Sequence, residues 1–235
     1  MAIIGIPVRY DHSKDEDKSI LYIFESLRLS IQKAGGDIFL IIPTQDFDYM
    51  DTRVRDFPPL SDFEKERIRS IVDKCDGLFL PGGIKFTPFD RYILDYAIEK
   101  DVPTLGVCLS MQMMSCYQED VQLEENDSSI NHHQLDVSDA HEVIIDKNSK
   151  LYKIVGKENI LVNSIHNYHA LENHIYKTVA KSPDGIIEAI EHPTATFNIG
   201  LQWHPEKDYD IDQNSQKILN TFIEYAKDYS KRKYL

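Results

Sequence analysis

Cysteine, positive charge and long apolar runs are all scarce in this sequence. Its 235 residues include three cysteines, Cys75, Cys108 and Cys116, and no two of them have CxxC spacing. This small, odd number argues against both a disulfide framework and a thiolate metal site. No apolar run approaches the roughly 18 residues that span a bilayer, and the N-terminus lacks a basic leader followed by a long apolar stretch. We therefore expect a soluble cytoplasmic protein with reduced thiols.

The shortage of positive charge excludes a second group of functions. The chain has 26 Lys and Arg residues against 39 Asp and Glu residues, which gives a formal net charge of -13. A field of this sign repels phosphate backbones and anionic lipid headgroups. We therefore expect neither a nucleic acid nor a membrane as a partner.

The apolar residues are numerous enough, at 42% of the chain, to build one core, and we treat residues 1–235 as a single domain. The first apolar run, "AIIGIPV", predicts a strand. The segment that follows predicts a helix over "SILYIFESLRLSIQKAGG", because apolar residues recur there at helical spacing: Ile20, Ile23, Phe24, Leu27 and Ile31.

The same alternation of strands and helices continues along the chain. Helices are predicted from about Ser61, over about residues 88–100 and over about 212–230. Strands are predicted in "DIFLIIP", "DGLFLPGG", "TLGVC" and "NIGLQW". Buried strands separated by helices indicate a parallel sheet covered on both faces. We therefore predict a flavodoxin-like, doubly wound α/β fold with a mostly parallel sheet.

Beyond residue 117 the pattern changes. A polar stretch is followed by β-rich runs, which we interpret as a small antiparallel extension of the same domain: "HEVIID", "ILVNSI", "YKTVAKS" and "GIIEAIEH". Histidines 132, 133 and 141 fall near the start of this region. Adjacent histidines rarely point to one ion, and no ligand spacing repeats, so we expect a solvated loop and no metal site there.

Three predicted strands end in residues that can carry chemistry. Gly82 and Gly83 follow one strand, Cys108 the next, and His204 the strand "NIGLQW". In a parallel α/β sheet, ligands bind at the carboxyl ends of the strands. We therefore expect these residues to share one cleft.

Cys108 is predicted to lie at a turn between a strand and a helix, flanked at two residues' distance by Gly106 and Ser110. A helix start or a nearby imidazolium stabilises a thiolate, and small flanking residues suit a nucleophile elbow. Taken alone, the motif also fits a buried structural cysteine.

Two other motifs supply the remaining parts of thiol chemistry. In "WHPE", His204 and Glu206 are two residues apart, so in an extended backbone the carboxylate could orient the imidazole. The glycines of "LPGG" let a backbone N–H approach a ligand and, with that of Leu109, form an oxyanion hole. A surface turn explains either motif in isolation, but the three together predict thiol acyl transfer.

These motifs, taken in order, carry a family resemblance. The sequence resembles the class I glutamine amidotransferase superfamily, and within it the γ-glutamyl hydrolase and γ-glutamyl-γ-aminobutyrate hydrolase group, the C26 peptidases. The resemblance extends through nearly the whole chain and depends on five stretches: "LPGG", "LGVCLSMQ", "VNSIHNY", "SPDGIIEAIEH" and "GLQWHPE".

The resemblance implies a role for each of these strand-end residues. Cys108 would be the nucleophile, His204 the general base and acid, and Glu206 the group that orients His204. The N–H groups of Gly83 and Leu109 would form the oxyanion hole. The implied reaction is hydrolysis of a γ-glutamyl amide bond through a thioester, which needs no metal or organic cofactor.

The resemblance also implies a set of substrate contacts and two other functions. The substrate would be a small γ-glutamyl compound, held by Gln112, Asn163, Ser164, His166, Asn167 and Tyr168. A glutaminase subunit that delivers ammonia to a partner synthase stays open as an alternative, as does a catalytically silent binding protein. A homodimer also stays open.

The chain departs from the family pattern beside the cysteine. Where family members usually have "CRGxQ", this chain has "CLSMQ", so Leu109 and Ser110 replace arginine and glycine. If the backbone φ angle is positive at Ser110, its Cβ adds strain of about 1 kcal/mol.

Overall fold

The computed structural model of the chain describes residues 1–13, 18–45, 49, 52, 56–116 and 123–233. Within these residues, no helix combines the length and the apolar composition needed to cross a membrane. The start of the predicted polar stretch, residues 117–122, lies outside them.

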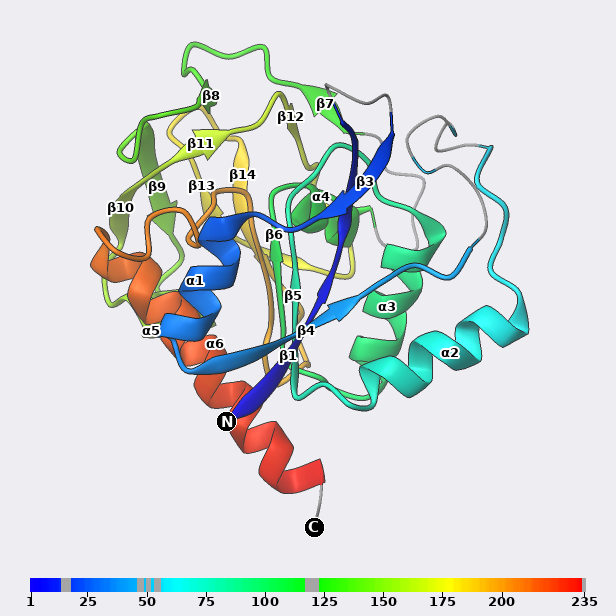
Figure 1. Cartoon of the computed structure of the whole chain (residues 1–235). Helices are drawn as coiled ribbons and strands as arrows, with labels where there is room; N and C mark the ends of the chain where they lie inside the picture. Colours follow the sequence, from blue (N-terminus) through cyan, green and yellow to red (C-terminus); the bar gives the residue numbers. More distant parts are fainter. Residues whose placement is uncertain (14–17, 46–48, 50–51, 53–55, 117–122, 234–235) are drawn as a thin grey trace.

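One nine-stranded sheet forms the centre of the molecule (Figure 1). Five neighbouring strands are mutually parallel: β4 (Gly36–Ile41), β1 (Ala2–Pro7), β5 (Gly77–Leu80), β6 (Thr104–Val107) and β15 (Asn198–Leu201). Four antiparallel strands continue the sheet beyond β15: β14 (Ile187–Glu191), β13 (Lys177–Lys181), β9 (His141–Ile145) and β10 (Asn159–Val162). The predicted fold is therefore confirmed, and the antiparallel extension contributes four of the nine strands.

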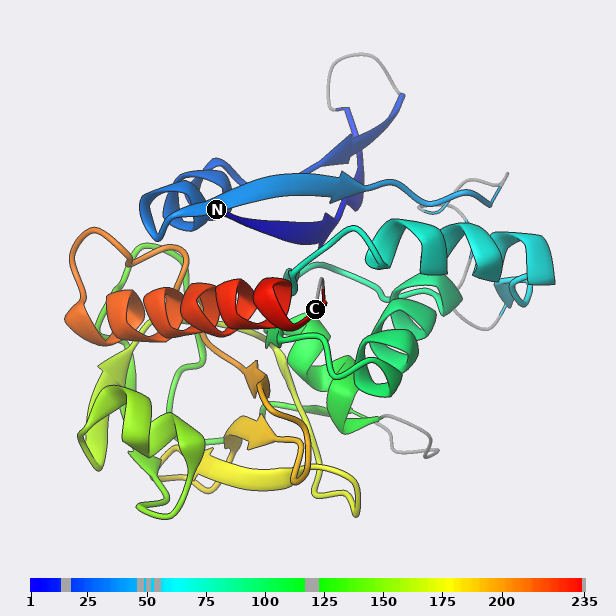
Figure 2. The same ribbon diagram turned by 90° about the horizontal axis from the view of Figure 1, so that it is seen from below.

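Helices cover both faces of this sheet. One apolar cluster includes residues of α1 (Glu25–Lys33), α5 (Lys150–Val155) and α6 (Gln213–Lys233). The other includes residues of α2 (Asp62–Val72), α3 (Pro88–Glu99) and α4 (Leu109–Ser115). Figure 2 shows α2 and α3 side by side, away from α6 and α1. Strand β5 contributes Phe79 to the first cluster and Leu78 and Leu80 to the second, because successive side chains of a strand point to opposite faces.

The helix predicted from Ser19 begins later than expected. Residues Ser19–Tyr22 form strand β3, which pairs with β2 (Arg9–His12) in an antiparallel hairpin, and α1 begins at Glu25. Ile20 is exposed, so the helical spacing of the apolar residues from Ile20 onward did not correspond to the buried face of a helix. Pairing with a second strand satisfied the backbone of this segment instead, which periodicity cannot reveal.

Two short ladders bring the segment after β10 close to the polar stretch. Strand β11 (Ser164–Ile165) pairs with β8 (His133–Gln134), and β12 (Tyr168–His169) pairs with β7 (Glu124–Glu125). Together they form part of the end of the molecule at the top of Figure 1.

The three chemistry-bearing strands are direct neighbours. Strand β6 pairs with β5 on one side and with β15 on the other, both in parallel. The registers place Leu80 beside Gly106 and Leu201 beside Val107, so the three strands end almost level. The residues that follow them therefore meet at one edge of the sheet.

Candidate active site

Cys108 lies in a strained turn between β6 and α4. It is the N-cap of α4, with φ 49° and ψ -109°, a region that non-glycine residues rarely adopt. Its N–H donates to the carbonyl of Leu201 at 2.7 Å, which ties the turn to the end of β15. The side chain is 8% exposed, and it forms part of the wall of a cavity.

The positive φ angle falls on Cys108 and not on Ser110. Ser110 belongs to α4 and does not have a positive φ, so the strain considered for its Cβ does not arise. Its hydroxyl donates to the carbonyl of Pro81 at 2.7 Å and accepts from Arg9 Nη2 at 2.8 Å. Ser110 therefore joins α4 to the loop after β5, a bond that glycine could not make.

His204 and Glu206 contact each other directly. The His204 Nδ1 atom lies 2.7 Å from Glu206 Oε1. Asn163 holds the backbone of His204 from both sides: its Oδ1 accepts from the His204 N–H at 2.9 Å, and its Nδ2 donates to the His204 carbonyl at 2.8 Å. The imidazole is therefore oriented by a carboxylate, and its backbone by an amide side chain.

The surroundings of His204 favour its charged form. Burial lowers the pKa of the imidazole, but the charge of Glu206, the neighbouring Cys108 thiol and the hydrogen bond to Glu206 outweigh this and raise the pKa from 6.5 to about 10. An imidazolium held beside a thiol stabilises the thiolate, which is the reactive form of cysteine.

The glycine pair after β5 lies close to both Cys108 and His204. A Cβ atom placed on Gly82 would lie 2.8 Å from His204 Cε1 and 3.3 Å from Cys108 Cβ. A side chain at this position would therefore collide with the imidazole. Gly83, the next residue, lines the same cavity as Cys108.

Seven of the predicted site residues line this cavity, which has a volume of about 490 Å³: Gly83, Cys108, Leu109, Gln112, His166, Asn167 and Tyr168. Gln112 donates from Nε2 to the Tyr168 carbonyl at 2.7 Å and to Gln202 Oε1 at 3.1 Å. Two of the predicted contacts, Asn163 and Ser164, lie elsewhere. Asn163 holds His204, and the Ser164 hydroxyl donates to the carbonyl of His132.

The family model of peptidase C26 matches residues 88–206, which include Cys108, His204 and Glu206. The chain belongs to the peptidase C26 family. The resemblance to class I glutamine amidotransferases is thereby confirmed.

Known proteins support this family and this fold. A candidate glutamine amidotransferase of Schizosaccharomyces pombe is 31% identical over 188 residues, which cover 67% of this chain and 72% of that protein. The CTP synthase of Porphyromonas gingivalis is 29% identical over 163 residues, 57% of this chain and 30% of that much longer enzyme. The glutaminase domain of Trypanosoma brucei CTP synthase, solved with bound acivicin, shares the fold. It aligns with a TM-score of 0.66 and 18% identity over 97% of this chain and 94% of that domain.

The sequence did not predict a buried ion pair that contacts the loop after β5 in this C26 chain. Arg9, which begins β2, donates from Nη1 to Asp90 Oδ1 at 2.6 Å, and both side chains are almost fully buried. Its guanidinium also donates to the carbonyls of Pro81 and Gly82. The available signal was an arginine directly after an apolar strand, but nothing near it in sequence indicated Asp90 as its partner.

The expectation of a solvated loop around the histidines is wrong for two of them. His132 and His141 are buried, whereas His133 is exposed. His132 lies just before β8, and His141 begins β9. The two short ladders and the antiparallel strands turn these side chains inward, an arrangement that the polar composition of the stretch did not indicate.

Replacing Asp90 with asparagine should destabilise the fold strongly, because it leaves the buried charge of Arg9 without a counter-charge. We expect Asp90→Asn to lower the free energy of unfolding by about 3 kcal/mol or more, measured by urea denaturation. Glu25→Gln is the matched control, since it breaks the exposed, solvent-screened pair with Arg28 and should lower the free energy of unfolding far less. Equal losses in the two variants would contradict this prediction.

Proposed function

We propose that this C26 chain hydrolyses the γ-glutamyl amide bond of glutamine or of a γ-glutamyl amine or peptide, through a thioester on Cys108. The observation that carries the proposal is the 2.7 Å contact between His204 and Glu206. It lies shortly after β15, the strand that pairs with β6, and Cys108 follows β6. Nucleophile, base and orienting carboxylate are thereby close together, as thiol acyl transfer requires.

The first half of the reaction forms the thioester. The Cys108 thiolate attacks the side-chain carbonyl carbon of the substrate, and the oxygen becomes an oxyanion. The His204 imidazolium then donates its proton to the leaving nitrogen, and the amine or ammonia departs as the carbonyl reforms. Before this proton transfer, Glu206 keeps the imidazolium oriented and stabilises its positive charge.

The oxyanion requires N–H groups aimed into the cavity. Arg9 binds the carbonyl of Gly82 on the protein side. In a trans peptide, C=O and the following N–H point in opposite directions, so the Gly83 N–H points away from Arg9. The Leu109 N–H, at the first turn of α4, would be the second donor. Arg9 is thus a positioning residue for the oxyanion hole.

The second half of the reaction releases glutamate. A water molecule gives a proton to the now neutral His204 and attacks the thioester carbonyl. The C–S bond breaks, Cys108 leaves as the thiolate, and His204 is again an imidazolium. The residues of this chain therefore return to their starting state with one water consumed.

The cavity fits a small γ-glutamyl substrate. Its volume of about 490 Å³ lies within the usual range for small-molecule sites. Gln112, His166, Asn167 and Tyr168 line it together with Cys108, and we propose them as contacts of the γ-glutamyl group. We give Asn163 a different role from the predicted one, because both ends of its amide hold His204.

A second candidate function is a glutaminase that supplies ammonia to a synthase. Similarity to CTP synthase, of which this chain covers 30%, favours it. In that case glutamine turnover should be slow for the isolated chain and should rise at least about tenfold when a synthase recovered with it by affinity capture is added. Turnover of γ-glutamyl amines by the isolated chain, unchanged by any captured protein, would contradict this function.

The nucleophile can be tested by comparing two cysteines at the two ends of α4. We expect Cys108→Ala to abolish glutamate release, since no other group in the cavity would form the thioester. Cys116→Ala, its matched control, should keep activity, because burial raises the pKa of the Cys116 thiol and keeps it protonated. Mass spectrometry of the wild-type chain after a rapid acid quench should detect a glutamyl thioester on the peptide that contains Cys108. Full activity of Cys108→Ala would overturn the proposed function.

Glu206→Gln should shift the pH dependence of activity. The pKa of His204 is raised to about 10, so its imidazolium, and the stability it contributes, persist at neutral pH and are lost as the pH rises through about 10. Glutamine keeps an oxygen acceptor but removes the charge, and we expect the alkaline limb of kcat/KM to move about 1 to 3 pH units lower. Glu172→Gln, at an exposed pair with Lys181, should leave the limb in place. An unmoved limb in Glu206→Gln would show that the carboxylate does not set the charge of His204.

A further inference from the structure

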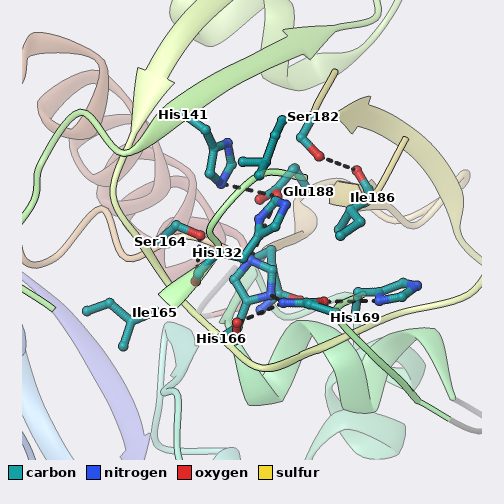
Figure 3. Close-up of polar contacts among 12 residues, drawn as sticks. His132, His141, Ser164, Ile165, His166, His169, Ser182, Ile186 and Glu188 are labelled. Atoms are coloured by element: carbon teal, nitrogen blue, oxygen red, sulfur yellow. Dashed lines mark hydrogen bonds and ion pairs between the residues drawn. The ribbon is translucent and has the colours of Figure 1, made fainter. Parts of the chain in front are cut away.

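Three histidines and one carboxylate meet in the interior beside the proposed active site. His132, His141, His166 and Glu188 are all at least nine-tenths buried. Each offers one nitrogen or oxygen atom, and these four atoms lie within 4.8 Å of one another. Figure 3 shows the side chains gathered around Glu188, which projects from β14.

The outer nitrogen of each ring lies near an oxygen that accepts a hydrogen bond, and the outer nitrogen of His166 also lies 3.2 Å from the Asn126 amide nitrogen. These oxygens are Asp184 Oδ2 at 2.9 Å from His132 Nε2, the Glu142 carbonyl at 3.1 Å from His141 Nδ1, and the Tyr168 carbonyl at 3.0 Å from His166 Nδ1. For His132 and His141 these partners can only accept, so the proton of the neutral imidazole lies on the outer nitrogen, and the same tautomer of His166 donates to the Tyr168 carbonyl. Each inner nitrogen is left with a lone pair that points toward Glu188.

The inner atoms are farther apart than the atoms of a normal hydrogen bond, and their separation suits shared coordination. The distances from Glu188 Oε1 to the inner nitrogens are 3.4 Å for His132, 3.5 Å for His141 and 3.8 Å for His166. All three nitrogens and both Glu188 oxygens lack a hydrogen-bond partner among the described residues. Two ligands that each lie 2.0–2.1 Å from a tetrahedral zinc ion are separated by roughly 3.3 Å.

We propose that His132, His141, His166 and Glu188 bind a divalent transition-metal ion, zinc by the chemistry of the ligands. Buried acceptor atoms without partners are costly, and one cation would bind the three nitrogens and one Glu188 oxygen at once. Three imidazoles select zinc over calcium or magnesium, which prefer oxygen ligands. The hydrogen bond from His132 to Asp184 is the carboxylate–histidine support common around zinc. Four protein ligands make this a closed, structural site.

The ion would hold the wall of the substrate cavity in place. Its four ligands come from separate segments, before β8, in β9, after β11 and in β14. His166 itself lines the cavity, and the carbonyl of its neighbour Ile165 lies 4.0 Å from Cys108 Sγ. Metal binding would therefore fasten the segment that faces Cys108 to the antiparallel half of the sheet. The site can be tested without substrate, so its test is independent of the proposed hydrolysis.

Metal content of the wild-type chain is the first test. Tag-free protein is incubated with ZnCl₂ and passed through a desalting column. It should then contain about one zinc ion per chain, measured by inductively coupled plasma mass spectrometry. Zinc should raise the thermal midpoint, and a chelator should lower it. Chain loaded with Co²⁺ instead should show the visible absorption of four-coordinate cobalt. Less than about 0.1 zinc per chain, with no change in the midpoint, would overturn the proposal.

Paired variants test the ligands themselves. Glu188→Gln and His141→Asn should each reduce zinc content at least about tenfold, whereas His133→Asn, which alters the exposed neighbour of His132, should retain it. If either ligand variant fails to fold, the cobalt spectrum of the wild-type chain still decides the coordination. Equal zinc in Glu188→Gln and in His133→Asn would show that the ion binds elsewhere and would overturn the assignment.

Discussion

The parallel pairing of β6 with β15 is the constraint on which the rest of the site depends. These strands are separated by almost a hundred residues, yet the register sets Val107 beside Leu201, and the N–H of Cys108 donates to the Leu201 carbonyl. The thiol and the imidazole of His204 therefore leave the sheet from adjacent strand ends. Strand β5 brings the glycine pair to the same edge. Without this pairing, the three motifs would be unrelated turns.

The geometry at this edge is maintained by buried polar groups around Cys108 and His204. Arg9 and Asp90 form a buried ion pair whose guanidinium also binds the carbonyls of the loop after β5. Ser110 bonds to the same loop, and Asn163 holds the backbone of His204. Buried polar groups are costly unless each is satisfied, so this network has few alternative arrangements. This network also holds the strained turn at Cys108 in place, since a strained backbone conformation persists only where the surrounding contacts enforce it.

The segment from Asn163 to Tyr168 connects the site with the antiparallel half of the sheet. Asn163 contacts His204, while the Tyr168 carbonyl accepts from both Gln112 and His166. His166 belongs to the buried histidine cluster around Glu188. One short stretch therefore contacts His204, lines the cavity and supplies one of the proposed metal ligands.

The sequence by itself determined the parallel strands, the helices after Ser61, Thr87 and Asp212, and the strand-end positions of Cys108 and His204, because periodicity and capping are local properties of the chain. It misplaced the start of α1, since the antiparallel pairing of Ser19–Tyr22 with β2 depends on a partner strand and not on spacing. Only the tertiary structure decided that Arg9 pairs with Asp90, 81 residues away, and that buried histidines converge on Glu188. Such contacts arise from packing between distant segments, which periodicity and capping, as local properties of the chain, do not record.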